Sequence, residues 1–186
     1  FKDNTSLKHK LLINNPNKIL EAFTFIEPAK NHNGFIDIES NDLKNTTVKI
    51  KNVSFDIDSR YVTDEKSKNN TGKIILPLFP MLQLSYLNSD IKYDDLTLSF
   101  DKLNLYTNDN ILNLNIKKEN SVIDLQTKNN TITLSAKNIT DRYINNLLNK
   151  EILEDGYVTI NAYGDDINLL SGDIKFHKTT IKNVTI

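Results

Sequence analysis

The sequence predicts a mainly β fold built around an antiparallel β-meander, and three features of residues 81–136 support this prediction. Apolar and polar residues alternate there in short runs, as in strands with one buried face. Segments rich in Asn, Asp and Lys separate the runs at about ten-residue spacing, as in consecutive hairpins. These connections are too short for the crossovers that parallel strands need.

Each expected strand of the meander places its apolar residues on one face and Asn, Thr, Ser, Asp or Lys on the other. The strands are expected at residues 82–86, 91–93, 96–100, 103–105, 112–116, 123–125 and 132–136. The turns between them are expected at residues 88–90, 107–110, 117–120 and 128–130. The sheet is therefore expected to be exposed to solvent on one face only.

Residues 1–73 are expected to form a less regular, β-rich part of the chain. Residues 16–26 are a candidate for a short helix that ends before Pro28. Three later segments have strand patterns, namely residues 35–39, 48–51 and 53–57. The alternation changes phase at Asn52, which indicates a bulge or a tight turn. Residues 63–72 contain no apolar residue, so they are expected to form an exposed, mobile loop.

One short helix is expected near residues 140–150. Thr140 suits its N-cap, and Asp141 suits its first turn. Four apolar residues then form one stripe at helical spacing: Tyr143, Ile144, Leu147 and Leu148. Further strands are expected around residues 158–162 and 174–176, and a last one from residue 181 to the end of the sequence.

The apolar face of these strands is too large to be left in water. Each apolar side chain covers roughly 32 Å² of sheet, so about eight strands with three such residues present roughly 770 Å². A soluble monomer rarely exposes an apolar patch beyond ~300–600 Å², and one short helix covers only part of this face. The sheet either folds against itself as a sandwich or closed barrel, or curls into an open, taco-like groove that holds an apolar ligand.

Charge balance and residue types argue against several classes of function. The 23 basic and 24 acidic residues give a net charge of −1. The chain therefore lacks the excess of basic residues that is typical of proteins that bind nucleic acid or anionic membranes. The chain has no cysteine, so disulfides and thiolate metal sites are excluded. The three histidines lack metal-ligand spacing: His9, His32 and His177. We expect neither a metal nor a cofactor.

Catalytic motifs are not expected either. Asp56 and Asp58 share one strand face, as paired carboxylates would, but this face is the solvated one. The acidic pairs 94–95 and 165–166 lie in expected turns, where Asp is favoured for local reasons. The sequence has no Gly-rich phosphate loop and no serine in a nucleophile elbow. We therefore expect a protein that is not an enzyme.

The order of segments in residues 74–186 resembles the C-terminal part of the AsmA-like family, which includes the YhdP-type and TamB-type lipid transport proteins of the bacterial envelope. The segments are ILPLFP, SDIKYDDLTLSFDKLNL, NILNLNI, VIDLQTKNNTITLSAKNIT, RYINNLLN, EDGYVTINAYG and LLSGDIKFHKTTIKNVTI. Gly156, Gly164 and Gly172 stand where the family pattern has glycine. Residues 178–180 depart from the pattern, since such proteins often carry a glycine turn there.

The resemblance implies that residues 74–186 form a β-groove segment of a long periplasmic protein, anchored to the inner membrane by a helix outside this chain. Its groove would conduct phospholipids between the inner and outer membranes, without catalysis, with other envelope proteins as further partners. Acyl chains would contact the apolar face, lined by Leu82, Leu84, Leu96, Leu98, Phe100, Leu103, Leu105, Leu112, Leu114, Ile116, Ile123, Leu125, Ile132, Leu134, Val158, Ile160, Ile174 and Phe176.

The alternative function is that of a structural or adhesive β-sandwich domain in a bacterial surface protein. Such a domain would close its apolar face into a core and bind protein or glycan through its loops or polar face. The two functions differ in one observable property, the solvent accessibility of the apolar face in lipid-free protein.

Overall fold

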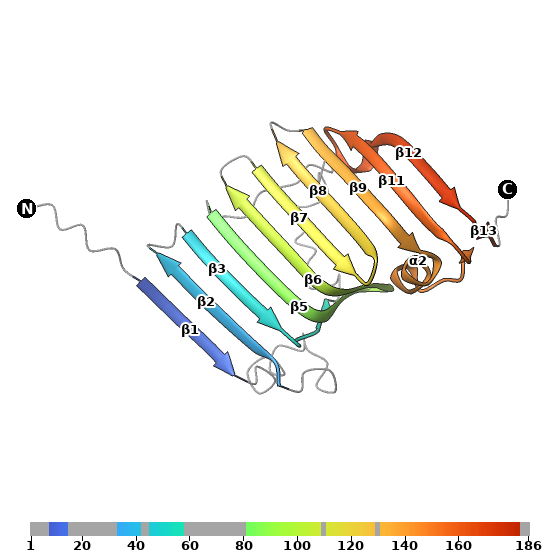
Figure 1. Ribbon diagram of the computed structural model, residues 1–186. Coiled ribbons are helices and arrows are strands. Elements are labelled where there is room, and N and C mark those ends of the chain that lie inside the picture. The colour runs from blue at the N-terminus through green and yellow to red at the C-terminus, as the bar shows by residue number, and fades with distance from the viewer. Residues whose placement is uncertain are drawn as a thin grey trace, which may run out of the picture.

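The structure is a computed structural model that describes residues 8–14, 33–41, 45–57, 81–108, 111–128 and 131–182. These residues form one large mixed sheet of eleven strands, one α-helix and a separate two-stranded pair (Figure 1). The prediction of a mainly β fold with an antiparallel meander is confirmed. The helix predicted at residues 16–26 and the loop predicted at residues 63–72 lie outside the described residues.

The large sheet has the strand order β1-β2-β3-β5-β6-β7-β8-β9-β11-β12, with β4 paired to β5. Its strands are β1 (Lys8–Asn14), β2 (Phe35–Asn41), β3 (Asn45–Lys51), β4 (Phe55–Ile57), β5 (Met81–Tyr93), β6 (Leu96–Asn108), β7 (Ile111–Lys118), β8 (Ser121–Lys128), β9 (Thr131–Thr140), β11 (Tyr157–Gly164) and β12 (Ser171–His177). The described edge strands β1 and β12 do not pair with each other, so the sheet is open.

Two further elements follow β9 and β11. The helix α2 (Asp141–Leu148) leads into β10 (Leu153–Glu154), which pairs with β13 (Thr180–Ile181) as a separate small sheet. A 3-10 turn, η5 (Ile167–Leu169), connects β11 to β12. Strands β3 and β4 both pair with β5 in parallel, whereas every other pair in the large sheet is antiparallel.

The turn predicted at residues 88–90 is wrong, because these residues lie inside the long strand β5. Asn88 has a left-handed backbone (φ 50°), which bends the strand while the pairing with β6 continues on both sides. Asn tolerates this conformation better than most residues. The alternation changes phase at the bend, so Tyr86 and Ser89 both lie on its buried side. The hairpin turn is at Asp94 instead. The strands expected at residues 82–86 and 91–93 are therefore parts of one strand, β5.

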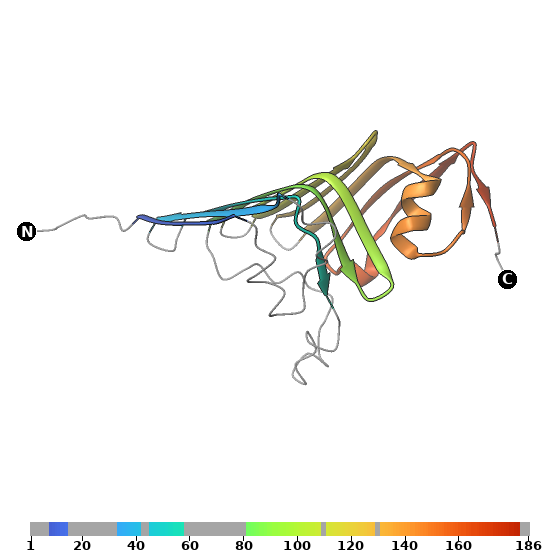
Figure 2. The same cartoon turned by 90° about the horizontal axis from the view of Figure 1, so that it is seen from below.

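The bend continues into the neighbouring parallel strand. The register pairs residue 51 with residue 87 and residue 55 with residue 91, which brings Asn52 level with Asn88. Asn52 is also left-handed (φ 53°), and its N–H donates to the Leu87 carbonyl at 3.0 Å. The irregularity predicted at Asn52 is therefore confirmed. Seen edge-on in Figure 2, β4 and the β5–β6 hairpin curl to one side of the sheet.

A buried polar network holds the inside of the bend. The Tyr86 hydroxyl donates to the Val53 carbonyl, and the Val53 N–H donates to Ser89 Oγ at 3.1 Å. The Tyr86 ring meets Phe100 edge-on, with ring centroids 4.8 Å apart, and only 2% of Tyr86 is exposed. This burial raises the pKa of the Tyr86 hydroxyl, which stays a neutral donor. Since each of these buried polar groups has a hydrogen-bond partner, the network stabilises one conformation of the bend.

The helix predicted near residues 140–150 is confirmed as α2. Thr140 is its N-cap and accepts the Tyr143 N–H at 3.2 Å, and Asn149 ends it in a left-handed conformation. Asn145 accepts the N–H groups of residues 152 and 153, which ties the following loop to the helix. Tyr143 packs on Ala136 and Ile139 at the end of β9. Within the described residues no helix has the length and apolar character required to span a membrane.

Candidate functional site

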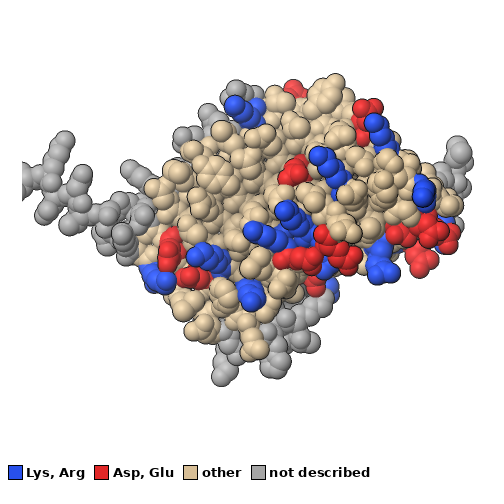
Figure 3. All heavy atoms as spheres, in the orientation of Figure 1, with Lys and Arg blue, Asp and Glu red and all other residues tan. Residues whose placement is uncertain are grey.

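The strand register, together with the change of phase at the bend of β5 and β6, places the predicted lining residues on one face of the large sheet. They come from β5 (Leu82, Leu84), β6 (Leu96, Leu98, Phe100, Leu103, Leu105), β7 (Leu112, Leu114, Ile116), β8 (Ile123, Leu125), β9 (Ile132, Leu134), β11 (Val158, Ile160) and β12 (Ile174, Phe176). The residues between them lie on the opposite face, which Figure 3 shows with Lys, Arg, Asp and Glu scattered over the sheet.

Directly paired residues on this face form two apolar stripes that cross the sheet at right angles to its strands. The first stripe consists of Leu11, Ile38, Val48, Leu84, Leu105, Leu114, Leu125, Leu134 and Ala162. The second stripe consists of Ile13, Ile36, Ile50, Tyr86, Leu103, Ile116, Ile123, Ala136, Ile160 and Ile174. At ~4.8 Å per strand, the second stripe is about 43 Å long.

The bend turns part of this face into a groove. A hollow of about 510 Å³ lies on the stripes where they pass the bend, and every residue around it is apolar: Ile50, Phe55, Leu84, Tyr86, Ile91, Leu103, Leu105, Leu112, Leu114 and Leu125. The stripes supply its floor. Phe55 in β4 and Ile91 in β5 lie beyond Asn52 and Asn88, so the curled part of the sheet supplies a wall.

The hydroxyl groups at one end of this face are bonded to the sheet itself. Thr107 Oγ1 accepts the Leu82 N–H at 3.1 Å, and Thr127 Oγ1 accepts the Leu112 N–H at 3.2 Å. Both threonines are buried. Because both hydroxyls are buried and already bonded to the sheet, this face offers a ligand mainly apolar contact and little hydrogen bonding.

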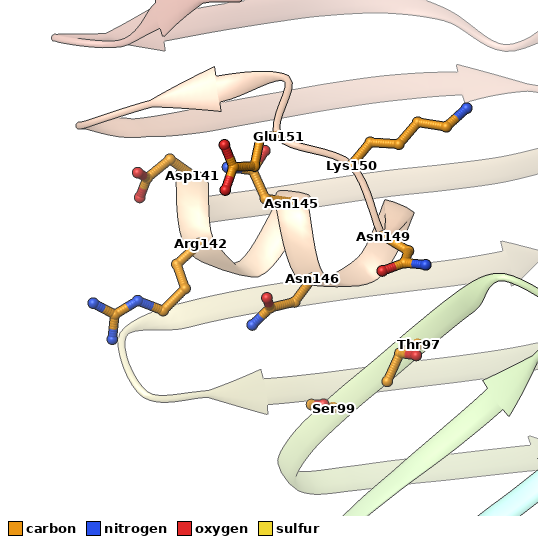
Figure 4. Close-up of a pocket in the computed structure, with 9 residues that line it drawn as sticks. All are labelled: Thr97, Ser99, Asp141, Arg142, Asn145, Asn146, Asn149, Lys150 and Glu151. Atoms are coloured by element: carbon orange, nitrogen blue, oxygen red, sulfur yellow. The ribbon is translucent and has the colours of Figure 1, made fainter.

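A second hollow, of about 660 Å³, lies between α2 and the tip of the β5–β6 hairpin and is polar (Figure 4). Its two cationic residues, Arg142 and Lys150, point away from each other from opposite ends of the helix. Two other lining residues have structural partners, since Asp141 accepts the N–H of residue 155 and Asn145 holds the loop after the helix. The polar groups therefore do not converge on one point, as a binding site for a charged ligand would require.

The candidate catalytic and metal-ligating residues are dispersed in the part of the chain that the structure describes. No three His, Cys, Asp or Glu residues gather there at metal-binding distance. His177 stacks on Tyr157 with ring centroids 4.4 Å apart, and His9 lies far from it, in β1. The Asp101 carboxylate accepts Lys118 Nζ at 2.8 Å and the Glu119 N–H at 2.7 Å, and these contacts lower its pKa.

Several residues of the face were missed by sequence reasoning. Tyr86 continues the alternation of Leu82 and Leu84, so its position was available from the pattern. The stripe residues of β1 to β3, by contrast, become part of the same face only through the parallel pairing of β3 with β5. Local alternation carries no information about that pairing, because it joins segments 36 residues apart.

Two comparisons with known proteins return nothing: neither the models of protein families nor the curated protein sequences contain a match to this chain.

Proposed function

We propose that the two apolar stripes form a track for phospholipid acyl chains, and that the chain is a non-enzymatic, lipid-conducting segment of the bacterial envelope. The observation that carries this proposal is the continuity of the second stripe, which runs from Ile13 to Ile174 across ten of the eleven strands of the large sheet without a charged residue. The resemblance of residues 74–186 to the AsmA-like family supports the same function.

The dimensions of the track favour movement of a lipid over tight retention. An acyl chain spans about half of a ~30 Å hydrocarbon core, so the track of about 43 Å is longer than one chain. Each buried methylene contributes about 0.8 kcal/mol, wherever along the stripe it lies. Because the stripe residues are similar from strand to strand, a chain that slides by one strand exchanges similar contacts. The head group stays in water at the open side of the groove.

The hydrogen bonding of the face favours lipid over a protein partner. Protein interfaces carry about one hydrogen bond per 100–200 Å². The hydroxyls of Thr107 and Thr127 are buried and each already accepts a backbone N–H of the sheet, so they offer a protein partner little hydrogen bonding. An acyl chain needs no such bond.

The same proposal includes a location and partners. The segment works in the periplasm, as part of a longer protein that a separate segment anchors to the inner membrane. Other envelope proteins at either end would load and receive the lipid. These statements follow from the family resemblance and stand or fall with it.

The test is photo-crosslinking in bacterial cells, with the crosslinking amino acid at position 114 and, as the matched control, at position 113. Leu114 belongs to the first stripe and lines the hollow, whereas Asn113 is its neighbour on the polar face of the same strand. We expect phospholipid adducts at position 114 and none above background at position 113. Absence of adducts at position 114, or equal adducts at both positions, contradicts the proposal.

The competing function, an adhesive domain with a closed core, makes a different prediction for lipid-free protein. The chain has no native cysteine, so single cysteines at positions 98, 114 and 134 report on the apolar face without interference. An open track leaves Leu114→Cys and Leu134→Cys reactive towards a water-soluble maleimide once lipid is extracted. Unreactive cysteines at all three positions favour the closed core.

A further inference from the structure

The free edge of β12 has the properties of a pairing site. It is the last strand of the large sheet, so one side of its backbone has no neighbour among the described strands (Figure 1). Six of its seven residues are exposed, including two large apolar side chains, Ile174 at 59% and Phe176 at 48%. An exposed edge with apolar side chains is a template for another strand.

We propose that β12 pairs antiparallel with β12 of a second copy of this chain, with Ile174 opposite Ile174 on a two-fold axis perpendicular to the sheet. This axis keeps the apolar faces of both copies on the same side. In this register Gly172 lies opposite Phe176 of the other copy, and Ser171 lies opposite His177. The proposal goes beyond the proposed lipid track and does not depend on it.

Charge complementarity selects this register. Asp173 lies opposite Lys175 of the other copy, and the two-fold axis repeats this ion pair on the polar face. The two nearest registers that keep the apolar faces matched place Asp173 opposite Asp173, or Lys175 opposite Lys175. Like charges directly opposite each other are unfavourable. A lysine on an edge strand usually discourages pairing, but here each Lys175 meets an acidic partner.

The apolar side chains fit the same register. Ile174 of each copy ends the second stripe, so the two stripes would join into one continuous apolar line. The Phe176 ring would lie across from Gly172, and an aromatic residue opposite a strand glycine covers the exposed backbone there. Gly172 has no room for a side chain, because an added Cβ would collide with the Asn161 carbonyl oxygen of β11. A seven-residue ladder is a small interface, so the dimer is expected to depend on protein concentration.

The first test is a charge swap in the full 186-residue chain, measured by sedimentation equilibrium over a range of concentrations. Asp173→Lys or Lys175→Asp alone replaces both ion pairs by like-charge pairs and should weaken dimerisation about tenfold. The double variant Asp173→Lys/Lys175→Asp restores opposite charges and should return to within about twofold of the wild type. A monomeric wild type, or a double variant as weak as the single ones, overturns the proposal.

The second test places a single cysteine on the proposed two-fold axis. The Ile174→Cys variant should form a disulfide-linked dimer on mild oxidation, because directly opposed residues of paired strands lie within disulfide reach. Phe176→Cys is the matched control: it lies on the same strand and face, but four residues from its own copy in this register, at roughly 13 Å. Equal crosslinking of the two variants, or none at position 174, overturns the proposal.

Discussion

Tyr86 and Tyr143 are both buried, at 2% and 6% exposed, but their hydroxyl groups differ. The Tyr86 hydroxyl donates to the Val53 carbonyl inside the bend. The Tyr143 hydroxyl has no hydrogen-bond partner among the described residues, and burial raises its pKa to about 12. Both side chains are neutral at physiological pH, so they differ in hydrogen bonding rather than charge.

This difference predicts opposite outcomes for the same substitution. Tyr86→Phe leaves the Val53 carbonyl without its side-chain donor and should lower the free energy of unfolding by about 1–3 kcal/mol. Tyr143→Phe removes a buried hydroxyl that has no partner and should leave stability unchanged within about 0.5 kcal/mol or raise it. Urea denaturation followed by circular dichroism measures both. A Tyr143→Phe variant that is the less stable of the two would contradict this account.

Asn88 carries a second prediction at the scale of single residues, because its left-handed backbone bends β5. A β-branched residue is strained in this conformation, so Asn88→Val should lower the free energy of unfolding by about 1–2 kcal/mol. Asn88→Gly is the control, since glycine adopts positive φ freely and should stay within about 1 kcal/mol of the wild type. Chemical denaturation compares the two. If Asn88→Val is as stable as Asn88→Gly, the bend does not depend on this residue.

At the scale of elements, the helix α2 is expected to need its N-terminal cap, because a helix of eight residues has little stability of its own. Replacing Thr140 by Ala removes the oxygen that accepts the Tyr143 N–H and should cost about 1 kcal/mol. Thr140→Ser keeps an accepting hydroxyl and should cost much less. Thermal denaturation of the two variants tests this, and equal losses would show that the cap bond contributes nothing.

The long bent strands explain why sequence patterns divided β5 and β6 incorrectly. Asn88-Ser89-Asp90 has the composition of a turn, and the apolar phase changes there, which together are typical of a hairpin. In the structure the backbone bends but its pairing to β6 resumes at Ser89 and Phe100. Whether a polar Asn segment bends or reverses a strand depends on the partner strand, so local composition does not distinguish the two.

For the whole molecule, the proposed track predicts that a charge on the stripes interferes with lipid. Leu125→Lys introduces an ammonium group on the first stripe, whereas Gln126→Lys places the same charge on the exposed face of the same strand. The amount of phospholipid that copurifies from bacterial cells should fall roughly tenfold for Leu125→Lys and stay unchanged for Gln126→Lys. Mass spectrometry of extracted lipid measures both. Equal lipid in the two variants would contradict the track.

The sequence by itself determined which residues share the apolar face of the meander. Away from the bend, side chains alternate with period two along a strand, so the face of Leu114 or Leu134 follows from its neighbours alone. The helix α2 was determined in the same way, because Thr140 and the Tyr143 stripe lie within one short segment. Local order of this kind needs no knowledge of the partner strand.

Only the tertiary structure decided how far that face extends and how it is shaped. The pairing of β3 with β5 adds the stripe residues of β1 to β3 to the apolar face. The left-handed residues Asn52 and Asn88 lie level with each other and bend the sheet, which forms the wall of the groove. Both features depend on contacts between segments distant in the sequence, whose free energy is a property of the assembled sheet. Local alternation in the sequence therefore predicts the apolar face, whereas the open groove depends on long-range pairing of strands.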